Sequence, residues 1–436
     1  MLQDRRRLDA TLVYLIFSGV SSLSFSLIVT VNLVYQVEVA KLNPLQLVLV
    51  GTALEVVCFL CQVPTGVLAD VYSRRLSVIV GVFLLGAGFI LEGSIPLFAT
   101  IVVAQGLFGI GATFMDGAEQ AWITDEVGED KVGRIFLRGT QVGLVAAFFG
   151  SFISVGLASI RLNLPIIVGG ALSVLLAGFL LLFMPEGSFR PAPKEARKSW
   201  GELANTFRNG TRVVRRSSVL ITILFVGLFY GLYSEGFDRL STAHLLADFT
   251  FPTLGQLKPV VWFGLFAAAE TVLSLGVSEL VKRRVDTSNQ KVVIRALFII
   301  NSMMIVGVLV FGLAGNFYIA VAAYLGFGVF RTVNHPVYMT WMTQNTEASV
   351  RATVISMGGQ VDALGQIVGG PPVGFVGSVF SLRAAMVTVS AILSPVLLLL
   401  VYAARKAKRP VIADVAVVTV EVTEDEGNTT ITPELV

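Results

Sequence analysis

Twelve long apolar stretches constrain this chain more than any other feature of its sequence. A bilayer core needs about 20 apolar residues per helix, and only 14% of the residues are charged, against about a quarter in a soluble domain. The stretches lack the alternating period of membrane strands, so the sequence predicts an all-α membrane protein with 12 transmembrane helices. These are expected near 11–35, 45–69, 76–93, 96–124, 134–160, 163–184, 218–238, 258–281, 291–313, 316–342, 351–377 and 380–403.

Lysine and arginine are unevenly shared between the connections, and this predicts the orientation. Positive residues concentrate in the cytoplasmic connections of membrane proteins. Here they cluster before the first stretch and after the second, fourth, eighth and twelfth, so we expect both termini in the cytoplasm and a multi-pass protein of the cell inner (plasma) membrane. The clustered residues are Arg5, Arg6, Arg7, Arg74, Arg75, Lys131, Arg134, Lys282, Arg283, Arg284, Arg405, Lys406, Lys408 and Arg409, and the scattered ones are Lys41, Arg161, Arg239, Lys258 and Arg383.

The two halves of the chain look duplicated. "FGIGATFMDGAEQAWIT" (108–124) aligns with "FGVFRTVNHPVYMTWMT" (327–343), and the same register goes on to match Gln141 with Gln360. We therefore expect two pseudo-symmetric six-helix bundles, 1–184 and 218–409. Internal repetition of this kind is typical of secondary transporters, whose binding site lies between the repeats near mid-membrane.

Residues 185–217 form the only long connection between the stretches and join the two halves. Apolar residues can share one helical face there, which favours an amphipathic helix on the anionic inner leaflet; a solvated linker is the alternative. The tail, 410–436, is expected to be disordered. The apolar face would hold Trp200, Leu203, Phe207 and Val214, against Arg208, Arg212, Arg215 and Arg216.

The short connection "GVLADVYSRR" (66–75) places charges between two apolar stretches. It resembles the signature loop between helices two and three of the major facilitator superfamily, through Gly66, Asp70, Arg74 and Arg75 together with Leu68 and Ala69. Val71 stands where that family has a basic residue and Ser73 where it has glycine. The resemblance implies a loop that latches the cytoplasmic ends of the two bundles and releases as they rock. A positive anchor with a tight turn is the alternative.

The residues themselves give physical reasons for this loop. Gly66 would allow a close approach between helices, Asp70 could accept hydrogen bonds from a helix N-terminus, and the two arginines could bridge to neighbouring carboxylates.

Ionisable residues inside the bilayer are costly, so each is a candidate functional residue. Asp116 and Glu119 are expected one turn apart on the fourth helix, and Arg331, Asn334 and His335 on one face of the tenth. By resemblance to the family, both helices line the central cavity. We expect Asp116 and Glu119 to carry a coupling proton, with His335 or Arg331 as partners. Static ion pairs are the alternative.

Several other polar residues within the stretches have less defined roles. Asp362 could titrate or pair with Arg331. Glu55 and Glu270 occupy matching places in the two halves, which favours a structural or gating role. A rim near the outer face is expected from Glu235 and Asp238 beside Arg239, and Cys58 and Cys61 are expected to be packing residues rather than a redox or metal pair.

The stretch "DGAEQAWITDEVG" (116–128) resembles bacterial 12-helix drug/proton antiporters of the superfamily, the multidrug exporters. The resemblance implies proton-coupled efflux of lipophilic small molecules or drugs, by a monomer. A facilitator or proton symporter importing a sugar or organic anion is the alternative, and a non-transporting scaffold is a third reading. We expect no cofactor, metal, nucleic acid or catalytic residue, because the sequence has no nucleophile–base pair, metal-spaced cluster or phosphate loop.

Overall fold

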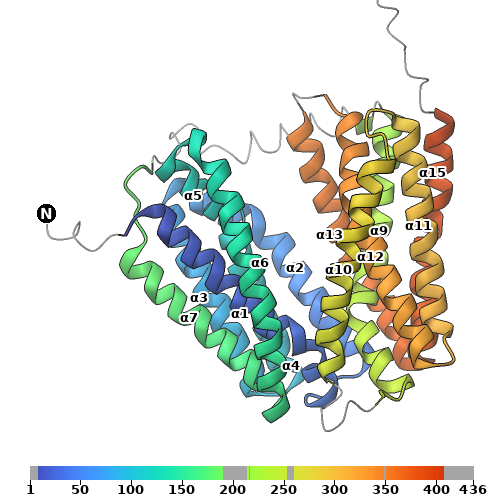
Figure 1. The fold of residues 1–436 in the computed structure, drawn as a ribbon, viewed down its shortest axis with the longest axis horizontal. Coiled ribbons are helices and arrows are strands. Elements are labelled where there is room, and N and C mark those ends of the chain that lie inside the picture. The colour runs from blue at the N-terminus through green and yellow to red at the C-terminus, as the bar shows by residue number, and fades with distance from the viewer. Residues whose placement is uncertain (1–7, 190–213, 216, 253–259, 348–349, 407–436) are drawn as a thin grey trace, which may run out of the picture.

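The computed structural model describes residues 8–189, 214–215, 217–252, 260–347 and 350–406, and its regular elements there are α-helices (Figure 1). The expected linker helix and the tail lie outside these residues, apart from the first and last few residues of the linker. The helices are α1 (Ala10–Glu38), α2 (Pro44–Val71), α3 (Arg74–Ser94), α4 (Phe98–Met115), α5 (Ala118–Val127), α6 (Glu129–Ile160), α7 (Leu164–Phe183), α9 (Ser218–Asp248), α10 (Val260–Arg284), α11 (Gln290–Leu313), α12 (Phe317–Gln344), α13 (Arg351–Val379), α14 (Leu382–Leu393) and α15 (Pro395–Lys406).

Local sequence sets where many of these helices begin. Asp9, Ser217 and Asn316 each accept a hydrogen bond from the backbone N–H three residues on, which satisfies one of the free donors of a helix start. Asn43 and Gln46 form a reciprocal capping box at the start of α2, with a proline at the first helical position. Polar residues placed just before apolar stretches therefore define the helix starts.

Eleven spans in the described part of the chain are long and apolar enough to cross a membrane. The α13 helix, at the eleventh predicted stretch, has 29 residues but is not among them. It carries Gln360, Asp362 and Gln366 and two internal prolines. Eleven of the 12 predicted apolar spans are thus found. The twelfth, α13, is a helix of sufficient length, but its polar side chains lower its mean hydropathy.

Two predicted helices are each divided into two. The fourth stretch breaks between α4 and α5 at Asp116 and Gly117, and Gly117 has a φ of 74°, a backbone conformation that favours glycine. The twelfth breaks between α14 and α15, at Pro395. The expectation of Asp116 and Glu119 on one continuous helix is therefore wrong, because the chain turns between them.

The seventh predicted stretch ends at 238, but α9 continues to Asp248. Arg239, expected in a connection, is therefore inside the helix. Glu235 and Arg239 form a buried i, i+4 ion pair of 2.8 Å rather than part of an outer rim. Pairing with Glu235 reduces the cost of burying Arg239 and lets the helix extend.

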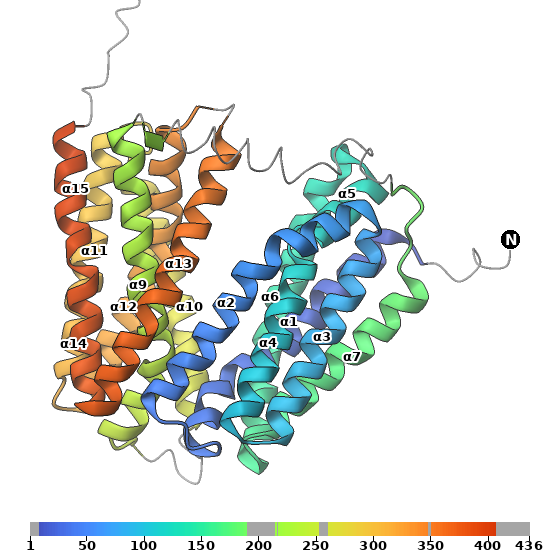
Figure 2. The same cartoon turned by 180° about the vertical axis from the view of Figure 1, so that it is seen from behind.

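The helices form two bundles, α1–α7 and α9–α15, that converge at one end and separate toward the other (Figures 1 and 2). We call the convergent end the α1–α2 end, after the connection that lies there, and the other the α2–α3 end. Contacts between the bundles run along α2 and α13. The Leu45 N–H donates to Ser378 Oγ at 2.8 Å, and Gln360 Nε2 donates to Gln62 Oε1 at 3.0 Å.

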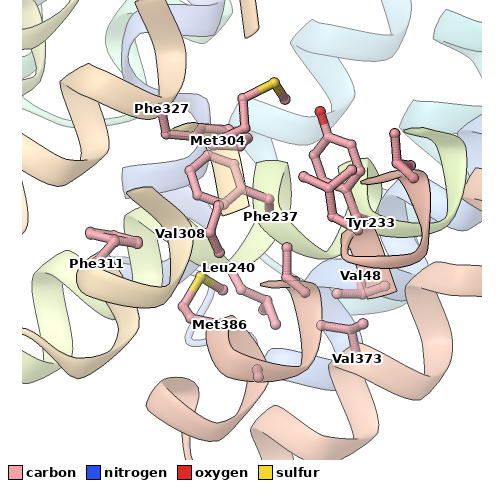
Figure 3. Packing of buried hydrophobic residues seen from close by; sticks show 14 of the residues in the cluster. Val48, Tyr233, Phe237, Leu240, Met304, Val308, Phe311, Phe327, Val373 and Met386 are labelled. Atoms are coloured by element: carbon pink, nitrogen blue, oxygen red, sulfur yellow. The ribbon is translucent and has the colours of Figure 1, made fainter. Parts of the chain in front are cut away.

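The core of the C-terminal bundle is aromatic and continues into the contact with α2. The rings of Phe237 and Phe327 pack at a tilt with centroids 4.1 Å apart, and Met304 and Phe311 are fully buried nearby. Figure 3 shows Val48 of α2 beside Val373 in this cluster. Apolar packing therefore joins the bundles at the α1–α2 end.

Candidate functional site

A chamber of about 610 Å³ lies within the N-terminal bundle. Its walls are apolar and aromatic with several hydroxyl groups, and Glu119 is the only charged side chain among its lining residues. Such a chamber can hold a small molecule of mainly apolar surface. The lining residues are Tyr14, Phe17, Ser18, Ser21, Ser22, Phe25, Val82, Leu85, Phe108, Ala112, Met115, Glu119, Gly139, Thr140, Gly143, Leu144, Ala147 and Ser173.

The break between α4 and α5 positions Glu119. Because α5 starts at Ala118, Glu119 lies in its first turn, where the helix dipole favours a negative charge. Asp116 caps the C-terminal end of α4 and is exposed. The two predicted carboxyl groups thus lie on either side of a turn, and only Glu119 lines the chamber.

Asp116 takes part in a hydrogen-bonded connection between the bundles. Gln62 of α2 donates to Asp116 Oδ2 at 3.2 Å and accepts from Gln360 of α13 at 3.0 Å. The expected arrangement of Asp116 facing Arg331 and His335 is not seen among these hydrogen bonds. Two glutamines connect the carboxylate to the C-terminal bundle instead.

Arg331 of α12 forms a two-pronged ion pair with Asp238 of α9, with Nη2 and Oδ2 2.8 Å apart. The pair lines a second pocket of about 220 Å³, together with Glu270 and Tyr324. Two carboxylates surround one guanidinium in this pocket, so the pocket has no excess positive charge for an anion.

The other predicted residues of α12 and α13 have separate surroundings. Asn334 is buried and accepts hydrogen bonds from Tyr230 and Asn301, whereas His335 is exposed. Asp362 accepts a hydrogen bond from Gln366 at 2.9 Å. The predicted continuous polar face of Arg331, Asn334 and His335 is thus divided between a pocket, the bundle interior and the surface.

The signature loop makes its recorded contacts within the N-terminal bundle. Arg74 pairs with Asp125 and, at 3.5 Å, with Asp70. An added Cβ at Gly66 would meet nothing within 4 Å, so the expected close approach there is wrong.

The N-terminus of α3, which follows this loop, has different hydrogen-bond partners from those expected. Ser73 caps the helix, and Glu186 accepts from the Ser73 hydroxyl and the Arg75 N–H. Asp70 was the residue expected to accept there, but its recorded partner is Arg74. Glu186 follows α7, so only the fold shows that it reaches this helix start.

Two buried titratable side chains are missing from the sequence-based predictions. Glu92 of α3 is fully buried and accepts hydrogen bonds from Gln36 at 2.7 Å and Gln105 at 2.8 Å. His244 of α9 is fully buried, with Asp248 at Nδ1 and the Phe311 carbonyl at Nε2. An ionisable residue inside an apolar stretch was the available signal for Glu92.

Apolar spans arranged in two bundles define a multi-pass membrane protein. The family model of the Major Facilitator Superfamily matches residues 11–370. This chain belongs to that superfamily of membrane transporters.

Relatives and solved structures agree with this assignment. An uncharacterized MFS-type transporter of Bacillus subtilis (strain 168), YxaM, is 22% identical over 399 residues, covering 88% of this chain and 94% of the relative. The fold is similar to that of the nucleoside transporter NupG (TM-score 0.72, 13% identity, 92% of this chain and 100% of that chain). It is also similar to a bacterial homologue of the human lysosomal transporter Spinster (TM-score 0.68, 15% identity, 91% and 96%).

Proposed function

We propose that this chain is a proton-coupled exporter of lipophilic small molecules that works by alternating access. The observation that carries the proposal is the chamber, where one carboxyl group lies among apolar and aromatic walls. Burial of apolar surface would bind the body of a lipophilic compound. Aromatic rings and the Glu119 carboxylate would favour a cationic group on it.

Competition at Glu119 between a proton and the substrate would couple proton movement to substrate export. A proton and a cationic substrate would each satisfy the same carboxylate, so binding of one would release the other on the appropriate side. Asp116 is proposed as the second coupling carboxyl, since its hydrogen bond to Gln62 connects it to α13. His335 and Asp362 are proposed as further titrating groups, while the ion pair with Asp238 favours a static role for Arg331.

The α2–α3 end is proposed to face the cytoplasm, which makes this state inward-facing. Basic residues are concentrated at this end, as expected of cytoplasmic segments. In this state loop 66–75 contacts its own bundle, and we propose that it reaches the other bundle when this end closes. The basic residues at this end include Arg74, Arg75, Lys282, Arg283, Arg284, Arg405 and Lys406.

A second candidate is uptake of a small polar metabolite, for which the 220 Å³ pocket is the supporting observation. Hydroxyl groups of Ser241, Thr242 and Tyr324 and the carboxylates there could bond to a sugar. The two carboxylates, Asp238 and Glu270, disfavour an organic anion.

The test is transport into and out of proteoliposomes under an imposed pH gradient, with lipophilic cations and sugars as probes. We expect Glu119→Gln to reduce proton-driven transport of the cations by about a hundredfold, within the range that a proton-transfer group contributes. Glu129→Gln, at an exposed carboxylate in the first turn of α6, is the control. Unchanged cation transport in Glu119→Gln would refute the proposal, and sugar uptake abolished by Glu270→Gln would support the alternative.

A further inference from the structure

The ion pair of Glu235 and Arg239 lies in the contact between the two bundles. Its side chains are only 5% and 15% exposed. Gly51 of α2 covers it so closely that an added Cβ would overlap Glu235 Oε1 and Arg239 Nε. Gly370 of α13 packs on the Glu235 side chain, where an added Cβ would lie 3.1 Å from Cγ. This charged pair is therefore sealed only while α2 rests on α9.

Glu55 lies one helical turn beyond Gly51, on the same face of α2. It is half-buried, and within the described residues it has no recorded hydrogen bond or ion pair. Arg239 acts on it electrostatically, and that guanidinium is already bonded to Glu235. Glu55 therefore faces the contact without a partner of its own.

Negative groups outnumber the cation at this place. Arg239 also interacts electrostatically with Glu92 of α3, which accepts hydrogen bonds from two glutamines. Arg331, which also acts on Glu235, is bonded to Asp238. Within the described residues, the charged and titratable groups that act on Glu55 are Glu235 and Arg239 of α9, Asp362 of α13, and Cys58 of α2 itself.

A carboxylate with no partner among other carboxylates is disfavoured in a half-buried contact, and this favours the neutral, protonated form of Glu55. When the bundles separate at the α1–α2 end, water reaches Glu55 and its charged form becomes stable. From this geometry we propose that Glu55 is a proton-binding residue of the bundle contact, which holds a proton while α2 rests on α9 and releases it to water when they part. No other bond changes in this step.

The inference rests on the proposed alternating access but not on Glu119 or any substrate. Because the closed contact binds one more proton than the open one, closure at the α1–α2 end is favoured as pH falls. The dependence is at most about tenfold in the closing equilibrium per pH unit for one proton. Protonation would then bias the transporter toward the state seen here.

The test measures the separation of the bundles at the α1–α2 end as a function of pH, without substrate. Spin labels on Val39→Cys and Phe380→Cys, at the exposed ends of α1 and α13, report this distance in a Cys58→Ser, Cys61→Ser background. Reconstituted protein is measured by pulsed electron resonance from pH 5 to pH 8. We expect the population with the short distance to grow as pH falls.

Three variants identify the group responsible. Glu55→Gln should hold the short distance at every pH, Glu55→Asp should keep the pH dependence, and Glu119→Gln should keep it as well. A pH dependence that persists in Glu55→Gln, or that is absent from the parent, would overturn the inference. Loss in Glu119→Gln alone would assign the proton to the chamber and equally overturn it.

A second measurement covers the case in which Glu55→Gln fails to fold. The infrared C=O stretch of a protonated carboxyl is recorded in the parent and in Glu55→Asp. A protonated-carboxyl band that shifts between them, and that disappears as the long distance becomes populated, supports the inference. An unshifted band contradicts it. Neither readout involves transport, so each can fail while the proposed export stands.

Discussion

The two bundles share a sequence repeat but differ in how they hold their charges. In the N-terminal bundle, Glu119 lines a roomy apolar chamber without a basic partner among the lining residues. In the C-terminal bundle, Arg331 is bonded to Asp238, and His244 to Asp248, at 2.7 Å. The chamber of the first bundle thus holds a carboxyl group without a basic partner, whereas the pocket of the second holds an ion pair.

Two glycines at matching positions of the two segments both lie close to a neighbouring helix. Gly109 of α4 packs against Leu54 of α2, and Gly328 of α12 packs against Glu270 of α10. The same register aligns Asp116 with His335 in sequence. One is a carboxylate that accepts a hydrogen bond from Gln62, and the other is an imidazole. The repeat therefore preserves close helix approach, while the polar residues of each bundle have diverged.

An effect on substrate binding is expected from filling the chamber of the N-terminal bundle. Ala112→Phe should weaken substrate binding by about tenfold or more, since losing ~1.4 kcal/mol of contact changes an affinity tenfold. Ala322→Phe, at an exposed position of α12, is the matched control. Binding of a lipophilic fluorescent cation measures both. Equal binding by the two variants would place the substrate outside this chamber.

A large effect on stability is expected in the C-terminal bundle, from breaking its buried ion pair. Glu235→Ala strands Arg239 in the bundle contact and should cost about 3–5 kcal/mol in unfolding free energy. The double variant Glu235→Met, Arg239→Met removes both charges and should recover most of this. Denaturation in detergent measures both, with Glu279→Gln, at an exposed pair, expected to change nothing measurable. Equal losses in the single and double variants would mean that the charges are not coupled.

The smallest expected effect separates the two histidines of the chain. His244→Ala removes one hydrogen bond to Asp248 within α9 and one to the Phe311 carbonyl of α11, and should cost about 1–3 kcal/mol. His335→Ala, at an exposed position, should change stability by no more than about 0.5 kcal/mol. Thermal unfolding at one pH compares them. A larger loss from His335→Ala would reverse the assignment of fastening to the α9 histidine.

The helices are predicted from the sequence, but one break and one helix end are not. The break at Asp116 and Gly117 carries a local signal, since Asp-Gly is a turn dipeptide, yet the apolar content around it favoured one continuous helix. The prediction that the seventh helix ends at 238 is wrong, because a charged residue such as Arg239 favours a connection on composition alone. Its partner lies one turn earlier, so the i, i+4 spacing was the signal that could have extended the helix.

What the sequence determined by itself is the all-helical membrane fold. The cost of bare backbone and charge in lipid depends on local composition, and local composition is visible in any short segment. Only the tertiary structure decided which charges have partners. Glu235 is sealed by Gly51 and Glu92 is held by Gln36, and these partners lie tens to hundreds of residues apart along the chain. Pairing depends on distance in space, which composition does not encode.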